Sequence, residues 1–145
     1  MAEELAPFFR KFLFKYKNLL DVKGATLVPV PLYWYRECDR GFNQAEELAK
    51  VIGKILELSI KNKLVFKKKS KNQAELERAE RHSNLLGHFS VRGRAPYFAE
   101  ATQDKPKNII IVDDVFTTGS TVKELAGVLR SAGAQNIQVI TLARG

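Results

Sequence analysis

The chain has 145 residues, of which 45% are hydrophobic and 28% are charged, and this length and balance predict a single soluble globular domain. The one cysteine, Cys38, excludes an internal disulfide and a cysteine metal cluster, and it fits a reducing compartment. No apolar run approaches the roughly 20 residues that cross a bilayer, and the N-terminus has no signal-peptide core. We therefore expect a cytoplasmic protein.

The formal net charge of +8 indicates an anionic partner, either a phosphorylated small molecule or a nucleic acid. The positive charge is uneven, because six lysines and no acid fall between residues 61 and 71. This run is either a solvated surface loop or a surface that binds an anion. Its lysines are Lys61, Lys63, Lys67, Lys68, Lys69 and Lys71.

Residues 5–20 are expected to form an amphipathic helix, because apolar side chains recur there every three or four positions. Such a helix either docks onto the core or offers a docking surface to another domain or a membrane. We assign residues 1–23 to this N-terminal helix and residues 24–145 to the core of one domain. The apolar stripe consists of Leu5, Phe8, Phe9, Phe12, Leu13, Tyr16, Leu19 and Leu20.

Strands and helices alternate along the rest of the chain, which predicts an α/β fold with a parallel sheet. The expected strands are 25–30, 64–66, 87–91, 109–112 and 137–142. A helix is expected over 43–57, and a second one starts near Thr121, which has capping-box spacing with Glu124, and ends at Gly133. Residues 70–84 are polar and have almost no apolar stripe, which indicates a mobile loop or a helix that orders when a ligand binds.

Residues 109–121, IIIVDDVFTTGST, are the most informative segment. Ile109–Val112 is a β-branched run typical of a strand buried on both faces, and Asp113 and Asp114 follow at its expected end. Thr117–Thr121 supplies hydroxyls and a glycine before a helix, and such a turn gathers N–H groups that bind phosphate. Paired carboxylates beside it suit a diol or a hydrated Mg²⁺. The segment therefore predicts a site for a phosphorylated sugar.

This segment resembles the PRPP (phosphoribosyl pyrophosphate) motif of type I phosphoribosyltransferases. The resemblance implies a mainly parallel, open twisted sheet flanked by helices, with a small or absent hood. It also implies that Asp113 and Asp114 bind the ribose hydroxyls and, directly or through water, the Mg²⁺ that accompanies PRPP. The ribose 5-phosphate would then contact Val115, Thr117, Thr118, Gly119, Ser120 and Thr121.

The exit of the first strand corresponds in this family to the pyrophosphate loop, which here maps to Val30, Pro31 and Leu32. The carboxyl ends of parallel strands meet at one edge of a sheet, so this exit, the lysine strand and the PRPP motif should converge on one cleft. Lys67 and Lys68 would then contact the pyrophosphate from the base of the cleft.

Departing pyrophosphate develops negative charge, so the reaction needs Mg²⁺ and fixed cations. Arg78 and Arg81 lie in the polar segment 70–84, which would close over the site as a lid. Together with Asp113 and Asp114 they are the candidate catalytic side chains.

Residues 36–45, RECDRGFNQA, resemble the competence protein F (ComF) family of phosphoribosyltransferase-like proteins. A second match to that family is Q-x-x-L-x-x-x-x-R-x-x-N-x-x-x-x-F, formed by Gln73, Leu76, Arg81, Asn84 and Phe89. Many members begin with a cysteine-rich zinc ribbon, which this sequence lacks, so any function of the ribbon is expected to be absent or supplied in trans.

Two functions follow from the resemblance. The first is an enzyme that transfers phosphoribosyl from PRPP to an unidentified acceptor, with Mg²⁺ and release of pyrophosphate, in connection with DNA uptake (competence). The second is a non-catalytic PRPP or nucleotide module that acts through single-stranded DNA or a helicase partner, and a scaffold with a relict pocket is a third alternative. Family members often associate, so a homo-oligomer is a further alternative. The hood that selects the acceptor would be the N-terminal helix or residues 92–107.

Overall fold

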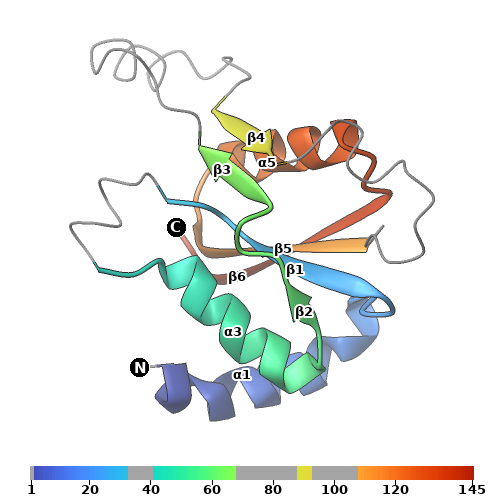
Figure 1. The fold of residues 1–145 in the computed structure, drawn as a ribbon. Helices are drawn as coiled ribbons and strands as arrows, with labels where there is room; N and C mark the ends of the chain where they lie inside the picture. Colours follow the sequence, from blue (N-terminus) through green and yellow to red (C-terminus); the bar gives the residue numbers. More distant parts are fainter. Residues whose placement is uncertain (1, 33–40, 68–87, 93–107) are drawn as a thin grey trace.

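The computed structural model describes residues 2–32, 41–67, 88–92 and 108–145 (Figure 1). Its main sheet has four parallel strands in the order β2-β1-β5-β6, and a separate ribbon pairs β3 with β4 antiparallel. The predicted class, a mainly parallel sheet flanked by helices, is confirmed. The strands are β1 (Ala25–Pro29), β2 (Ser59–Ile60), β3 (Val65–Lys67), β4 (Phe89–Val91), β5 (Asn108–Phe116) and β6 (Asn136–Arg144). The helices are α1 (Ala2–Tyr16), a 3-10 turn (Lys17–Leu19), α3 (Gln44–Leu56) and α5 (Ser120–Ser131).

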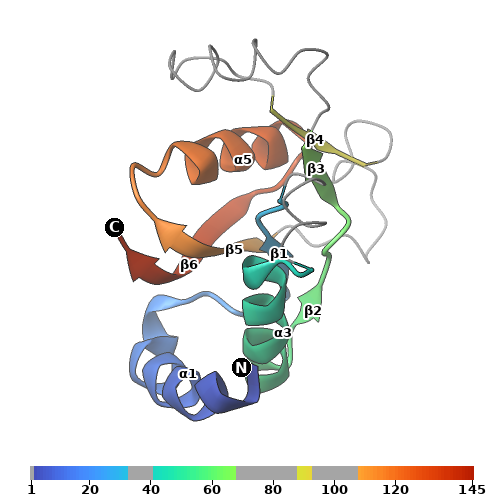
Figure 2. The ribbon, with the colours of Figure 1, turned by 90° about the vertical axis from the view of Figure 1, so that its left-hand side faces the viewer.

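The sheet lies between two layers (Figures 1 and 2). Helices α1 and α3 cover one face, and α5 with the β3–β4 ribbon covers the other. Successive side chains of a strand point to opposite faces, so Ile109 and Ile111 pack towards α5 while Ile110 and Val112 pack towards α1 and α3. All four side chains are fully buried, which confirms that this apolar run is a strand covered on both faces.

The β3–β4 ribbon covers the sheet instead of extending it. Leu64, Val65 and Phe89 are buried in the core that α5 forms with the sheet. The sequence predicted β3 and β4 as strands but did not distinguish them from the parallel set. The short β2 was not predicted, because two residues leave no readable pattern.

The N-terminal helix docks along only part of its apolar stripe. Phe9 and Leu13 are buried with α3 and the sheet, as the core-docking interpretation predicts. Phe8 and Phe12 of the stripe stay exposed, as do Phe14, which is not part of the stripe, and Leu19 in the 3-10 turn. Among the helices that the structure describes, none is both long and apolar enough to span a bilayer.

Asn43 joins the exit of β1 to the start of α3. Its side-chain Oδ1 accepts a hydrogen bond from the Ala45 N–H at 3.0 Å, which caps the helix. Its Nδ2 donates to the Val30 carbonyl at 3.1 Å, and the side chain is buried. One amide thus holds the strand exit and the helix start together.

We expect Asn43→Ala to lower the free energy of unfolding by about 1–2 kcal/mol, because the cap is lost and the Val30 carbonyl loses its partner. Asn43→Asp keeps the cap acceptor but sets a second acceptor oxygen against the Val30 carbonyl, so it should not restore the full stability. Urea unfolding measures both. The control is Asn62→Ala, which removes an exposed bond to Glu46 and should change stability by less than about 0.5 kcal/mol. Equal losses for Asn43→Ala and the control would contradict this role.

Candidate functional site

Both aspartates of the motif lie inside β5, not after it. The strand was predicted to end at Val112, but it continues to Phe116 because β6 continues beside it, also beyond its predicted span of 137–142. The register pairs Asp113 with Thr141 and Phe116 with Arg144. On the other edge β1 ends its pairing with β5 at Val112. The two acids therefore project past β1 while β6 holds their backbone rigid.

Asp113 is a buried carboxylate with only 8% of its surface exposed. Its pKa is raised from 3.8 to about 6, mainly by burial and also by the neighbouring Asp114 side chain, while the hydrogen bond from the Asp114 N–H and the charge of Lys67 lower it. Its Oδ1 accepts the Asp114 N–H at 2.9 Å, and Asp114 Oδ1 accepts the Val115 N–H at 2.9 Å. The pair thus combines one carboxyl group that titrates near pH 6 with a more accessible carboxylate.

Lys67, at the end of β3, is close enough to act on the charge of Asp113. Its Nζ also lies 5.3 Å from the centre of the Phe89 ring on β4. The predicted convergence of the lysine strand with the acidic pair therefore holds for Lys67. Three other predicted site residues, Lys68, Arg78 and Arg81, lie outside the described residues.

The turn after β5 presents backbone N–H groups and hydroxyls. The first intrahelical bond of α5 runs from the Lys123 N–H to the Gly119 carbonyl at 2.8 Å, so the N–H groups of the helix residues before Lys123 precede the ladder. Thr118 and Ser120 are exposed, and their hydroxyls lie 3.0 Å apart. This geometry suits a phosphate at the positive end of a helix.

Gly119 is required in this turn for two reasons. Its φ of 76° is left-handed, and an added Cβ would lie 2.7 Å from a carbon of the Phe116 ring. Gly119 is also the N-cap residue of α5, so no side-chain hydrogen bond caps this helix. The predicted capping box of Thr121 and Glu124 is therefore wrong.

Glu124 instead fastens the β3–β4 ribbon to α5. It accepts the His88 N–H at 2.6 Å and faces His88 Nδ1 at 3.1 Å. The contact joins residues 36 positions apart, so no local pattern could reveal it. It keeps β4, and with it Lys67 on β3, in place relative to the turn.

At the exit of β1, two of the three residues of the predicted pyrophosphate loop have no N–H group available to an anion. The Val30 N–H donates to the Val112 carbonyl at 2.9 Å, and Pro31 has no N–H. Of these three residues, the half-buried Leu32 is the one whose N–H group could donate to an anion. Val30 and Pro31 shape this exit.

The acidic pair fits a metal only in combination with a ligand. Within the described ranges, no three His, Cys, Asp or Glu side chains are grouped to hold a metal ion. Mg²⁺ usually takes one or two carboxylates, several waters and the phosphates of a substrate. Asp113 and Asp114 therefore suit a Mg²⁺ that arrives with a diphosphate.

The strand, the acid pair and the hydroxyl-bearing turn define a class of protein. Residues 39–145 match the phosphoribosyl transferase domain, and the chain belongs to that family.

Within the family, the chain is similar to competence protein F of Haemophilus influenzae, with 36% identity over 81% of this chain and 49% of that protein. It is also similar to competence protein ComFC of Streptococcus pneumoniae, with 30% identity over 99% of this chain and 56% of that protein. DNA utilization protein YhgH of Escherichia coli K12 shares 34% identity over 81% of this chain and 48% of that protein. The predicted likeness to competence protein F is confirmed, and the chain spans about half the length of these curated relatives.

We expect Asp113→Asn to stabilise the fold above pH 6. The folded state of the natural protein holds the Asp113 proton more tightly than the unfolded state, so its contribution to stability is full below pH 3.8 and is lost as the pH rises to about 6. Asparagine is neutral and keeps the oxygen that accepts the Asp114 N–H. The gain at pH 7.5 should be about 1–2 kcal/mol, less than the full shift because water reaches the site.

Urea unfolding at pH 4.5 and 7.5 measures this effect. The gain should shrink markedly at pH 4.5. Asp21→Asn is the control, because Asp21 is exposed and lies away from the motif. A gain that is equal at both pH values would count against a buried charge at Asp113.

Proposed function

We propose that the chain binds PRPP together with Mg²⁺ and transfers its phosphoribosyl group to an acceptor. The supporting observation is that a single connection, from β5 to α5, carries both the Asp113–Asp114 pair and a turn with N–H groups ahead of the helical ladder. A vicinal diol needs acceptors and a phosphate needs donors. This connection offers both within a few residues.

In the proposed complex, the 5-phosphate lies at the turn 117–121 and the ribose hydroxyls donate to Asp113 and Asp114. The pyrophosphate lies between the Leu32 N–H and Lys67, with Lys68, Arg78 and Arg81 as further proposed cations. When bound, Mg²⁺ offsets the charge that develops on the pyrophosphate.

The proposed reaction is a substitution at ribose C1. A nucleophilic atom of the acceptor forms a bond to C1 while the bond from C1 to the pyrophosphate oxygen breaks. The pyrophosphate leaves with the electron pair, and the acceptor releases its proton to water. The names of the relatives refer to competence and DNA utilization, so we propose that this reaction serves the handling of DNA in the cytoplasm.

Calorimetry of PRPP binding, with and without Mg²⁺, tests the proposed function. The natural protein should bind, and omission of Mg²⁺ should weaken binding at least about tenfold. The double variant Asp113→Asn/Asp114→Asn should lose at least about a hundredfold in affinity, because each lost bond to a carboxylate is worth roughly 1.5–3 kcal/mol.

Asp21→Asn is the matched control and should bind as the natural protein does. Absence of binding by the folded natural protein, or equal binding by the double variant, would reject the proposal. Pyrophosphate release with acceptors then separates an enzyme from a non-catalytic PRPP module.

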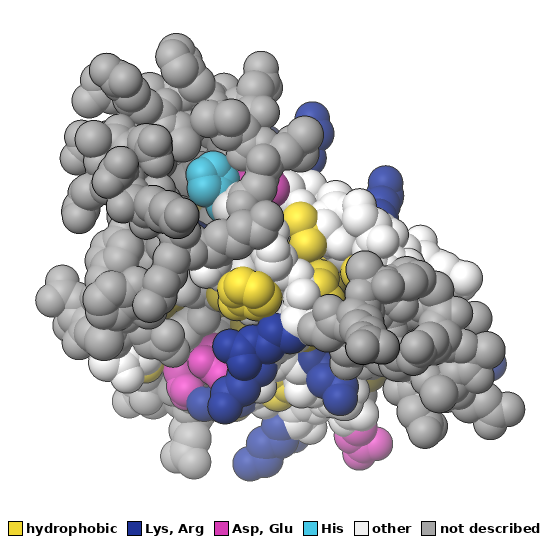
Figure 3. Space-filling model, turned by 45° about the horizontal axis from the view of Figure 1, so that its top comes forward, with side chains coloured by type: hydrophobic (Ala, Val, Ile, Leu, Met, Phe, Trp, Pro, Cys, Tyr) yellow, Lys and Arg dark blue, Asp and Glu magenta, His cyan; other side chains and the backbone are white. Residues whose placement is uncertain are grey.

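A second candidate function, binding of single-stranded DNA, is favoured by the surface of the β3–β4 ribbon. Phe66 has 37% of its side chain exposed, and the Arg92 guanidinium lies 5.7 Å from its ring centre. Lys61 and Lys63 are exposed just before β3. On the side of the molecule where the ribbon lies, lysine and arginine side chains gather beside an exposed hydrophobic side chain (Figure 3). An aromatic ring among cations is a surface on which bases stack and phosphates pair.

Fluorescence anisotropy with an oligothymidylate tests this candidate. We expect Lys61→Glu/Lys63→Glu to weaken DNA binding and to reduce its salt dependence by roughly 1.4 log units of affinity per log unit of salt. Phe66→Ala should weaken binding by about 1–3 kcal/mol. Lys11→Glu/Lys15→Glu makes the same charge change on α1, on the opposite face, and should weaken binding less. Equal effects of the two lysine pairs would show that only net charge matters.

A further inference from the structure

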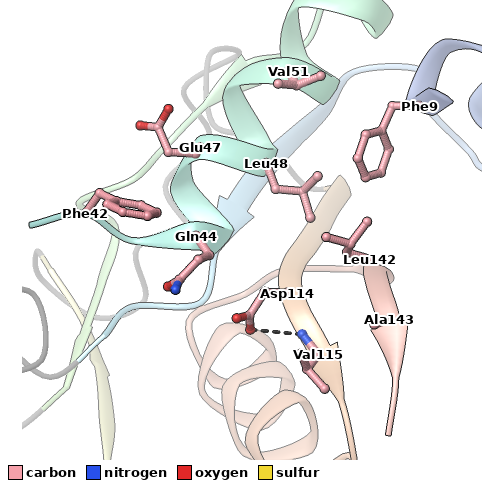
Figure 4. A pocket seen from close by; sticks show the side chains of 10 residues that line it. All are labelled: Phe9, Phe42, Gln44, Glu47, Leu48, Val51, Asp114, Val115, Leu142 and Ala143. Carbon is pink, nitrogen blue, oxygen red and sulfur yellow. Dashed lines mark hydrogen bonds between the residues drawn. The ribbon is translucent and has the colours of Figure 1, made fainter. Parts of the chain in front are cut away.

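The N-terminal helix α1 and the β3–β4 ribbon lie on opposite sides of the main sheet (Figures 1 and 2). One side of α1 is buried, because Phe9 and Leu13 pack with α3 and the sheet. Phe9 points towards Leu142 across an apolar pocket of about 530 Å³, which lies between α3 and the ends of β5 and β6 (Figure 4). Phe9 and Leu13 are four positions apart, so together they mark the row of α1 that faces the sheet.

Two rows of exposed side chains run along another side of α1. Phe8 and Phe12 are four positions apart, and they are 63% and 41% exposed. Lys11 and Lys15 are also exposed, and each follows one of these rings by three positions. Residues three and four positions apart are neighbours on a helix, so each lysine lies next to a phenylalanine. We call the surface formed by Phe8, Lys11, Phe12 and Lys15 the aromatic–basic face.

The rings of the aromatic–basic face are in contact with other rings of the same helix. The Phe8 ring meets the buried Phe9 ring edge-on, with 5.9 Å between their centres. The centres of the Phe12 and Tyr16 rings lie 4.7 Å apart, and Lys15 Nζ lies 5.3 Å from the centre of the Tyr16 ring. The face therefore belongs to a helix that is packed on the core, and it presents apolar and cationic side chains in a fixed pattern.

Positive charge and apolar surface continue along the whole segment. Residues 6–20 contain four cations and no acid, and the acids Glu3 and Glu4 precede them in the first turn of α1. Leu19, in the 3-10 turn that follows the helix, is 76% exposed. Phe8 and Leu19 are eleven positions apart, which corresponds to roughly 16 Å at the rise of an α-helix. The segment is thus a long basic strip with large apolar side chains at both ends.

The charge of the aromatic–basic face decides which partner fits it. In a twofold dimer the same face of a second copy would lie opposite, so lysines would face lysines. An anionic partner pairs with the lysines instead. Single-stranded nucleic acid follows basic grooves in which bases stack on rings, whereas α1 displays its rings on the convex surface of a helix. An anionic bilayer offers charged headgroups and, just beneath them, apolar chains, and it therefore matches both kinds of side chain.

We propose that the aromatic–basic face of α1 docks this protein on the surface of an anionic lipid bilayer. Phe8, Phe12 and Leu19 enter the boundary between the headgroups and the acyl chains, and Lys11 and Lys15 lie among the anionic headgroups. Helix α1 then lies parallel to the bilayer plane, and the sheet and the β3–β4 ribbon lie on its far side from the lipid. The inference does not depend on the proposed function.

Sedimentation with lipid vesicles tests the proposal. One set of vesicles consists of phosphatidylcholine alone, and the other is an equal mixture of phosphatidylcholine and phosphatidylserine. The natural protein should bind the mixed vesicles at least about tenfold more tightly, because only these carry a negative surface charge. Added salt should weaken the binding to the mixed vesicles, since it screens the attraction between the lysines and the headgroups.

Two lysine pairs separate the face of α1 from the net charge of the protein. Lys11→Glu/Lys15→Glu should weaken binding to the mixed vesicles at least about twentyfold, because each cation near an anionic surface contributes about fivefold. Lys61→Glu/Lys63→Glu makes the same change of charge on the exposed surface just before β3, and it should weaken binding much less.

The apolar side chains of the face are tested in the same way. Phe8→Ser/Phe12→Ser keeps every charge and should weaken binding to the mixed vesicles at least about tenfold, because less apolar surface is buried. Phe66→Ser changes an exposed ring of the ribbon and should leave vesicle binding unchanged. The fluorescence that Phe8→Trp adds to the protein should be quenched by brominated lipids in mixed vesicles, whereas that added by Phe66→Trp should not. Urea unfolding verifies that each variant is folded.

Several results would overturn the inference. These are the absence of binding to mixed vesicles, equal losses for the two lysine pairs, or no lipid quenching in Phe8→Trp. A dimer that is seen by ultracentrifugation and lost in Phe8→Ser/Phe12→Ser would assign the face to a second copy instead. Oligothymidylate binding that depends more on the α1 lysine pair than on the other pair would assign it to DNA. PRPP binding by the α1 variants should be unchanged, so the proposed function is tested separately.

Discussion

The pairing of β5 with β6 beyond the end of β1 is the constraint on which the site depends. Backbone hydrogen bonds to β6 hold this part of β5 in an extended conformation, while the pairing with β1 on the other edge ends at Val112. The same extension brings the Phe116 ring against Gly119, so a side chain at that position would strain the backbone and displace the ring. Acid pair, turn and helix start therefore form one rigid connection.

The electrostatics of the connection favour ligand binding over stability. Asp113 is buried where its charge is costly, and Lys67 offsets that cost only in part. A bound diol would donate hydrogen bonds to the carboxylate, and a Mg²⁺ would favour its charged form. Groups with such a raised pKa are common in binding sites. A ligand that binds to them in the folded protein alone raises the free energy of unfolding.

The two faces of the sheet have different roles. On the α5 face, the Glu124–His88 contact holds a short basic ribbon against the helix that carries the phosphate turn. On the other face, α1 buries Phe9 and Leu13, and an apolar pocket lies between Phe9, α3 and the ends of β5 and β6 (Figure 4). The two sides of the acidic pair therefore differ, with a basic ribbon on one and an apolar pocket on the other.

The sequence by itself determined the class of fold, the buried strand Ile109–Val112, the helices near 43–57 and 121–133, and the family, because each is written in local periodicity or in a contiguous motif. It did not determine where β5 ends, since a ladder with β6 sets that point and strand pairing leaves no local pattern. The use of Glu124 as a partner of His88, the role of Asn43 at the β1 exit and the pocket beside Asp114 likewise depend on residues far apart in the chain. Only the tertiary structure decided these features, because each requires two or more elements to be placed side by side.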